Sequence, residues 1–447
     1  MTAMTPAKTD ELSYDQISAG RRWFLLILAS IGSSIIYAPA YLKAVFYDPL
    51  VAALGVTNEQ MGAVTAAYAW TAVICYLPSG IIADKVRMRT LSSAGFLATA
   101  VLTGVFALLP NLTVLYIIFI LMGITTIFIW WGVRYKLVRL VSKEDEYPQR
   151  IGLSYGIYGV AGLAIGLVST AIVAAVGENL NLGVSIYLWF LAGLIGLLGV
   201  LSLLFIPKFK GEIKQGGGFN LNEFLLALQN PVVWVAAISL FFVYFFYTGI
   251  TYSTPYLTGV MGASLVVTTI IANIRTYGIT LLSGPAFGYI ANKFKPSITI
   301  VGGSVAFAVA LAALLMLPAG TGAVVAAAII VVLLGFIANG SFSVVSAQLT
   351  EGRVPLGYFG AATGLLSVIG FLPDTFSGIW FGRIMDNHTD ANKVVAPAAY
   401  QQMFLILIGS AIIAAAVSAV LYFYVRKNRA KLEAKEAAYL AETPAAS

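Results

Sequence analysis

Apolar blocks of about 20 residues recur along almost the whole chain, from Trp23 to Val425. A helix of this length crosses the hydrocarbon core of a bilayer, which is about 30 Å thick. Of the 447 residues, 60% are hydrophobic and only 10% are charged, against roughly 25% charged in soluble domains. No stretch alternates in polarity as the strands of a membrane barrel do. The blocks therefore predict an all-α polytopic membrane protein.

The blocks number twelve. The predicted spans are residues 22–50, 60–83, 92–110, 112–138, 151–176, 183–206, 231–257, 264–290, 297–317, 321–348, 356–382 and 400–425. The first block is too long, and is followed by too many others, to be a cleavable signal. The single cysteine, Cys75, lies inside the second span and excludes an intramolecular disulfide framework.

The net charge is +7, and the position of the basic residues relative to the predicted spans indicates the topology. In the twelve-span arrangement, 21 of the 26 Lys and Arg residues fall on one side of the membrane. Basic loops mark the cytoplasmic side. We therefore expect a multi-pass protein of the cell (inner) membrane with both termini in the cytoplasm, and no nucleic-acid partner.

A polar segment with three consecutive glycines, residues 207–230, separates the sixth span from the seventh. This composition predicts a flexible linker, followed by a short interfacial helix. The linker divides the chain into a cytoplasmic N-terminal segment (1–21), a six-helix bundle (22–206), the linker itself (207–230), a second six-helix bundle (231–425) and a cytoplasmic tail (426–447).

The two bundles resemble each other in sequence. The segment GIIADKVRMR follows the second span and GYIANKFK follows the eighth, with glycine, an acid or amide, and lysine at the same spacing. Parallel repeats of six helices occur in secondary transporters, whose substrate site lies between the halves near the bilayer midplane. The repeat, the span count and the linker together predict such a transporter.

The whole chain resembles the major facilitator superfamily, and GIIADKVRMR resembles that superfamily's loop signature between spans two and three. Gly80, Asp84, Lys85 and Arg89 match the signature, whereas Arg87 stands where it usually has glycine. The resemblance implies twelve transmembrane helices in two six-helix halves. It also implies a gating loop that holds the outward-facing state closed on the cytoplasmic side, where the acid would act at neighbouring helix ends.

Four ionisable residues are serious candidates for functional charges inside the spans: Lys43, Arg134, Arg275 and Asp374. Intramembrane charges are costly and mostly face a cavity or a partner. Three cations against one anion favour a negatively charged substrate. Arg275 lies roughly 16 Å into its span at 1.5 Å per residue, and its planar fork suits carboxylate, phosphate or nitrate. We expect it to bind the substrate anion, the alternative being a buried ion pair.

Asp374 follows Pro373, which predicts a kink in the eleventh span. Asp374 is either a proton carrier or the counter-ion of Arg275, and the residues leave both roles open. Lys43 either binds substrate or snorkels at the outer rim, and Arg134 either lines an inner vestibule or anchors at the interface. Further candidates for substrate binding, through hydroxyl or amide groups, are Tyr37, Tyr41, Tyr247, Tyr277 and Asn273.

Within the superfamily, the chain resembles in part the organic anion and sugar-phosphate exchanger branch. The likeness lies in RRWFLL at the first span, in the arginine of span four before SKE, and in YSTPYL closing span seven. That branch binds phosphate through basic residues in spans one and seven. Here Tyr247 stands about where the second would fall, so the partial likeness favours a carboxylate or similar anion over a phosphorylated substrate.

No enzymatic activity and no cofactor are expected. The segment GLSYG, residues 152–156, has the form of a hydrolase nucleophile elbow but begins a membrane span, and the only histidine, His388, lies in an outer loop. Its glycines instead belong to a small-residue face, which we expect to pack on span eight. That face consists of Gly152, Gly156, Gly159, Gly162 and Gly166. Neither a phosphate-binding loop nor a metal-ligand cluster is present in the sequence.

These patterns predict a monomeric secondary transporter that carries a small organic anion across the lipid bilayer by alternating access. Proton coupling through Asp374, or exchange against a counter-anion, would drive it. One alternative is a proton-driven drug exporter of the same fold, for which Asp48 would be the nearest acid in the first half. Another is a transporter-like membrane sensor, which would bind its ligand without translocating it.

Overall fold

The computed structural model describes residues 11–143, 146–177, 179–213, 221–355 and 358–442. Ten helices in these ranges are long and apolar enough to cross a membrane, and two bent helix pairs raise the number to twelve if each pair is one span. The predicted all-α polytopic fold is confirmed. The two bent pairs are the second and eighth predicted spans, with bends of 58° and 42°.

The first half follows a two-residue strand, β1 (Glu11–Leu12), and a short 3-10 turn, η1 (Tyr14–Gln16). Its helices are α1 (Ala19–Ile36), α2 (Tyr47–Leu54), α3 (Asn58–Lys85), α4 (Met88–Ala107), α5 (Leu112–Gly123), α6 (Trp131–Leu140), α7 (Tyr147–Val176) and α8 (Leu180–Phe205). The linker then contributes β2 (Lys208–Phe209), which pairs in parallel with β1, and α9 (Leu221–Leu228), the short helix expected near its end.

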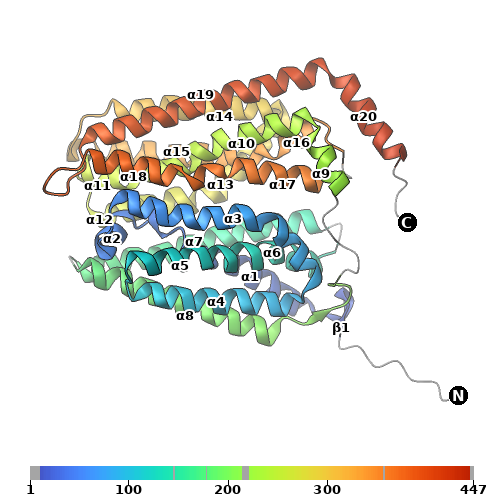
Figure 1. Cartoon of the computed structure of the whole chain (residues 1–447), viewed down its shortest axis with the longest axis horizontal. Coiled ribbons are helices and arrows are strands. Elements are labelled where there is room, and N and C mark those ends of the chain that lie inside the picture. Colours follow the sequence, from blue (N-terminus) through green and yellow to red (C-terminus); the bar gives the residue numbers. More distant parts are fainter. Residues whose placement is uncertain (1–10, 144–145, 178, 214–220, 356–357, 443–447) are drawn as a thin grey trace.

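The second half has the same kind of order. Its helices are α10 (Pro231–Gly249), α11 (Ser253–Gly259), α12 (Leu265–Asn273), α13 (Thr280–Phe294), α14 (Pro296–Leu315), α15 (Val324–Val345), α16 (Ala347–Glu351), α17 (Phe359–Gly370), α18 (Ser377–Asn387) and α19 (Pro397–Lys427), with a turn, η6 (Thr321–Ala323), before α15. A final helix, α20 (Arg429–Glu442), follows α19 at an angle (Figure 1).

The two halves lie side by side, with α1–α8 in one layer and α10–α19 in the other (Figure 1). The first and last described elements, β1 and α20, lie at the same end of the molecule. We call this the basic end, because α3 ends there at Lys85 and α19 at Lys427. The opposite end, where α3 begins at Asn58 and α18 ends at Asn387, is the far end.

Glycines let the halves approach closely toward the far end. Helix α3 packs on α18, and α7 packs on α12. A Cβ added at Gly62 of α3 would lie 2.1 Å from the carbonyl oxygen of Gly378 in α18. In the second pair, Gly162 of α7 faces the ring of Tyr277 and Gly166 faces the amide of Asn273. At Gly62 the neighbour is backbone, so any side chain there would push α3 and α18 apart.

Toward the basic end the same faces are loose. Gly152 and Gly156 of α7, and Gly284 and Gly288 of α13, have no heavy atom within 4 Å of an added Cβ. The expected packing of the span-five glycines on span eight is therefore confirmed for Gly159–Gly166 and absent for the two glycines nearest the basic end. The halves are thus joined tightly at the far end and more loosely at the basic end.

Five spans contain irregular turns. They are η2 (Leu42–Ala44), η3 (Ile124–Ile129), η4 (Ile250–Tyr252), η5 (Ile274–Gly278) and η8 (Leu372–Thr375), of which η3 and η5 are π-helical. Pro373 lies in η8, so the predicted kink is confirmed. Irregular backbone at membrane depth persists only where protein or a polar cavity satisfies its hydrogen bonds. Lys43, Arg275 and Asp374 lie within these turns, and Arg134 follows η3.

The close contact at Gly62 predicts a stability effect. Gly62→Ala should lower the melting temperature of the purified protein, because overpacking of this kind costs about 1–3 kcal/mol. The matched control is Gly284→Ala, which meets no neighbour and gains helix propensity of up to about 1 kcal/mol. Thermal unfolding in detergent checks both, and equal melting temperatures for the two variants would contradict the close contact.

Candidate functional site

Arg275 is buried, with 3% of its surface exposed, and its guanidinium binds neutral oxygens. Nη1 donates to the carbonyl of Ile250 (3.0 Å) and to the hydroxyls of Ser253 (2.8 Å) and Thr254 (3.1 Å). Nη2 donates to the carbonyl of Ala44 (2.5 Å), which belongs to the first half. Among the described residues, the ion pairs do not include Arg275. It therefore joins the breaks η4 and η2 across the two halves.

Asp374 lies apart from this arginine. Its Oδ2 accepts a hydrogen bond from the hydroxyl of Tyr244 (2.6 Å), and the opposite charge that acts on it is Lys43 of the first half. Lys43 itself donates to the hydroxyl of Thr65 (2.9 Å), so the two charges interact across the halves without direct contact. The sequence left open whether Asp374 is the counter-ion of Arg275. Among the described residues, Asp374 binds Tyr244 directly and interacts with Lys43 only through longer-range electrostatics.

Arg134 is also 3% exposed, but its surroundings differ. The guanidinium carbon lies 4.3 Å from the ring centre of Tyr155, 5.3 Å from Tyr158 and 5.5 Å from Tyr135. Cation–π contacts of this kind stabilise the charge but leave the N–H groups at its edge free. Nε and Nη2 are buried and have no hydrogen-bond partner in the described part of the chain. Nε and Nη2 can therefore still donate hydrogen bonds to an anion.

The other predicted site residues fall into two groups. Tyr37 donates to the carbonyl of Thr126 in η3 (3.2 Å), Tyr41 packs edge-on against Tyr68, and Tyr247 stacks on Phe342 at 4.8 Å between ring centres. Asn273 and Tyr277 instead lie against the glycines of α7. Asn273 donates to the carbonyl of Gly166 (2.9 Å), so in this conformation it bonds the two halves together.

Several of these partners carry no recognisable signal in the sequence. Thr65, Ser253 and Thr254 bind the buried cations, yet an isolated Ser or Thr in an apolar span carries no signal of such a role. The carbonyl of Ala44 is less predictable still, because a backbone acceptor becomes available only where a helix breaks.

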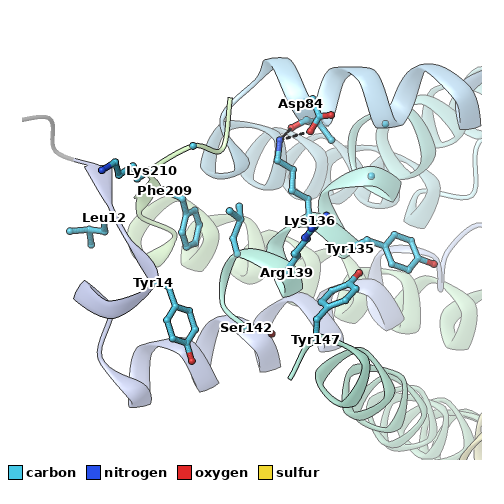
Figure 2. Close-up of a pocket in the computed structure, with 15 residues that line it drawn as sticks. Leu12, Tyr14, Asp84, Tyr135, Lys136, Arg139, Ser142, Tyr147, Phe209 and Lys210 are labelled. Atoms are coloured by element: carbon cyan, nitrogen blue, oxygen red, sulfur yellow. Dashed lines mark hydrogen bonds and ion pairs between the residues drawn. The ribbon is translucent and has the colours of Figure 1, made fainter. Parts of the chain in front are cut away.

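Two of the gating-loop residues, Gly80 and Asp84, line a cavity of about 580 Å³ at the basic end of the first half (Figure 2). Lys136 of α6 donates to Asp84 (2.8 Å) and to the carbonyl of Ala83 (2.6 Å). Arg89 donates to the carbonyl of Ile206 (2.6 Å), Gly80 lines the cavity and Lys85 is exposed. In this conformation the Asp84 carboxylate thus pairs with a lysine of its own half.

Arg87, which departs from the loop signature, connects three segments. It pairs with Glu11 of the N-terminal segment (2.5 Å) and with Glu212 of the linker (2.8 Å). Hydrogen bonds to Glu212 and to Glu11 raise the pKa of the Arg87 guanidinium above its usual value. Glu212 is 1% exposed and also accepts from the backbone N–H of Met88, in the first turn of α4. The loop is therefore tied to the linker.

Comparison with known proteins agrees with this architecture. The family profile of the Major Facilitator Superfamily matches residues 22–378. The Escherichia coli (strain K12) inner membrane protein YqcE is 28% identical over 399 residues, covering 87% of this chain and 92% of YqcE. The inner membrane protein YihN of the same organism is 25% identical over 374 residues, covering 82% and 88%.

Solved structures resemble the chain in fold. A bacterial homologue of the human lysosomal transporter Spinster, in an inward-facing and unoccupied conformation, superposes with a TM-score of 0.71 at 14% identity, covering 93% of this chain and 99% of that one. The nucleoside transporter NupG, as a D323A mutant, gives 0.68 at 15% identity, covering 90% and 100%. At these identities the likeness extends to the fold and not to the ligand.

Glu212 generates a prediction at the basic end. Glu212→Gln should lower the free energy of unfolding by about 1–3 kcal/mol, because a buried hydrogen bond to a charged group is lost. Asp15→Asn, which changes an exposed carboxylate at the same end, is the control and should leave it unchanged. The shift in melting temperature measures the effect, and an unchanged value for Glu212→Gln would mean that the linker is not held through Arg87.

Proposed function

The chain belongs to the major facilitator superfamily, and from that premise we propose that it is a secondary active transporter of a small organic anion. The superfamily accounts for transport by an alternating-access fold. The observation that carries the anion assignment is Arg134, a buried guanidinium with two nitrogens that bind nothing in the described part of the chain. A buried, unsatisfied donor on a charged group is costly. An anion with two oxygens would satisfy both nitrogens at once.

The aromatic rings around Arg134 support a carboxylate on a small carbon skeleton. Tyr155 and Tyr158 cover the guanidinium faces, so an incoming anion must approach along the edge, where the N–H groups lie. Tyrosine rings also offer apolar surface to a carbon skeleton and hydroxyl groups to its oxygens.

The other intramembrane charges each have a hydrogen-bond partner. Lys43 donates to Thr65, Asp374 accepts from Tyr244, and Arg275 binds carbonyl and hydroxyl oxygens. Arg275 therefore stays a predicted substrate ligand for a different state. Opening of the far end would separate it from Ala44 and free Nη2 for an anion. In a multi-pass inner membrane protein, the positive-inside rule places the basic end at the cytoplasm. The anion would then pass from Arg275, nearer the outside, to Arg134, nearer the cytoplasm, or in the reverse direction.

Asp374 is suited to couple protons to this movement. Its carboxylate has one tyrosine hydroxyl as donor and one lysine of the other half as its opposite charge. Rocking of the halves changes the distance to Lys43, and the proton affinity of a buried carboxylate depends strongly on a nearby cation. The same movement that exposes the site to one side would thus favour uptake or release of a proton. A fixed carboxylate that only orients Tyr244 would give anion exchange instead.

Two alternatives predict different measurements. A drug exporter would attract organic cations to an acid in the first half. The nearest approach to such an acid is Asp48, which lies in α2 at the far end. A membrane sensor would bind an anion without moving it. Uptake of labelled short carboxylates, sugar phosphates, nitrate and organic cations into proteoliposomes separates these functions from anion transport.

Removal of the Arg134 guanidinium should strongly reduce this uptake. Arg134→Gln is expected to lower anion uptake at least tenfold, because a hydrogen-bonded charge contributes about 1.5–3 kcal/mol. Arg134→Lys keeps the charge but loses the planar fork and should recover little. Lys143→Gln, an exposed change at the same end, is the control. Undiminished anion uptake by Arg134→Gln would remove the basis of the assignment.

Proton coupling is tested at Asp374. Asp374→Asn keeps an oxygen that can accept from Tyr244 but removes the titratable group. We expect exchange of internal for external anion to persist, while accumulation driven by an inward proton gradient is lost. The comparison uses the same proteoliposomes with and without the gradient, and Tyr244→Phe serves as the matched variant that keeps the acid. Gradient-driven accumulation by Asp374→Asn would show that protons travel elsewhere or not at all.

A further inference from the structure

A carboxylate of the second half binds the first turn of a helix in the first half. Asp386, at the end of α18, accepts from the backbone N–H of Asn58 (3.1 Å) and from the Asn58 side-chain amide (2.8 Å) through Oδ1. Its Oδ2 accepts from the backbone N–H of Glu59 (2.8 Å). Three hydrogen bonds from α3 thus converge on one carboxylate at the far end of the molecule.

These bonds complete the cap of α3. The first N–H groups of a helix have no intrahelical partner and need an acceptor. Thr57, the residue before α3, satisfies the N–H of Gln60 (3.2 Å) and receives a bond from the Gln60 side chain in return. The two N–H groups that Thr57 leaves are those of Asn58 and Glu59, which Asp386 takes. Negative charge is favourable at a helix N-terminus, so the cap is also electrostatic.

The surroundings hold this contact in register. The hydroxyl of Tyr47 donates to Oδ1 of Asn58 (3.0 Å), which directs the amide nitrogen of Asn58 toward Asp386. Gly382, one turn before Asp386, lies against the backbone of Asn58, where an added Cβ would be 2.3 Å from the carbonyl oxygen. Only a glycine at that position brings the end of α18 close enough for the carboxylate to bind.

A second contact lies beside the first but is exposed. Arg383 donates to Glu59 through Nη2 (2.6 Å) and Nε (3.1 Å), and 62% of the Arg383 side chain is exposed. Exposed ion pairs contribute little to stability. Asp386 is half-buried and binds the backbone N–H groups of Asn58 and Glu59, which lie in the first turn of α3 and so have no acceptor within their own helix. The carboxylate, and not the ion pair, is therefore the stronger connection between α3 and α18.

We propose that Asp386 is a latch that keeps the far end closed, by capping α3 of the opposite half only while the two halves meet there. Opening of the far end must break all three bonds and expose the N–H groups of Asn58 and Glu59 to water. The latch thereby sets the ratio of the state closed at the far end to the state open there. It acts on the conformational equilibrium and is independent of the substrate's chemical nature.

The test measures far-end opening directly in the full-length protein. Cys75→Ser removes the single cysteine, and Leu108→Cys and Met316→Cys place spin labels at exposed far-end positions, one on each half. Double electron–electron resonance in lipid nanodiscs then gives the distribution of distances between the labels. In Asp386→Asn we expect the ratio of the short-distance to the long-distance population to fall about tenfold or more, because charge-assisted bonds are lost.

The matched control is the double variant Glu59→Gln with Arg383→Gln, which removes the exposed pair and keeps Asp386. It should shift the populations much less than Asp386→Asn. Three results would overturn the latch: an unchanged distribution in Asp386→Asn, an equal shift in the double variant, or a lower melting temperature without any population shift. If Asp386→Asn does not fold, Asn58→Ala removes only the side-chain bond and should give a smaller shift in the same direction, and its absence would also refute the latch.

Discussion

Lipid hydrocarbon offers no hydrogen-bonding partner, and this constraint governs the entire molecule. It explains why the described spans are helical, and it also determines where they can break. Each interruption frees backbone groups that only another part of the protein can satisfy. Arg275 illustrates the result, because its guanidinium serves the carbonyl of Ile250 in one break and that of Ala44 in another. A buried charge and two broken helices thus stabilise one another.

The buried charges are accommodated in three ways. Arg275 is surrounded by neutral oxygens, Lys43 and Asp374 act on each other across the halves, and Arg134 lies among tyrosine rings. Only the last arrangement leaves buried donors without a partner among the described residues. Aromatic faces stabilise a cation without occupying its hydrogen-bonding edge. Whether the buried N–H groups have hydrogen-bond partners therefore distinguishes a structural arginine, Arg275, from a candidate anion-binding arginine, Arg134.

Glycines at the contacts between the halves would allow the halves to move relative to each other. Along α7, Gly162 and Gly166 are in tight contact with the second half, whereas Gly152 and Gly156 face open space. A glycine face can lie close to the second half or apart from it, because it has no bulky side chain that would clash on approach or lose its packing on separation. Helices α3 and α18 have a comparable close contact at the far end, where Asp386 binds the backbone N–H groups of Asn58 and Glu59. In the proposed latch, packing permits the rocking motion and these polar contacts favour the arrangement that is closed at the far end.

The sequence by itself determined the all-helical membrane fold, the division into two halves, the kink at Pro373 and the identity of the intramembrane charges. Hydropathy, proline and charge are local properties, so they can be read directly from the amino-acid sequence.

The sequence could not determine which side chains are hydrogen-bond partners. Asp374 and Tyr244 are 130 residues apart, and Arg275 and Ala44 are 231 apart. Which side chains meet depends on the rotation of each helix and on the relative position of the halves. The π-helical turns η3 and η5 had no sequence signal either, because their residues resemble those of the regular helix around them. Only the tertiary structure decided that Asp374 accepts a hydrogen bond from Tyr244 and that Nε and Nη2 of Arg134 lack a partner among the described residues, because these outcomes arise from packing between distant segments.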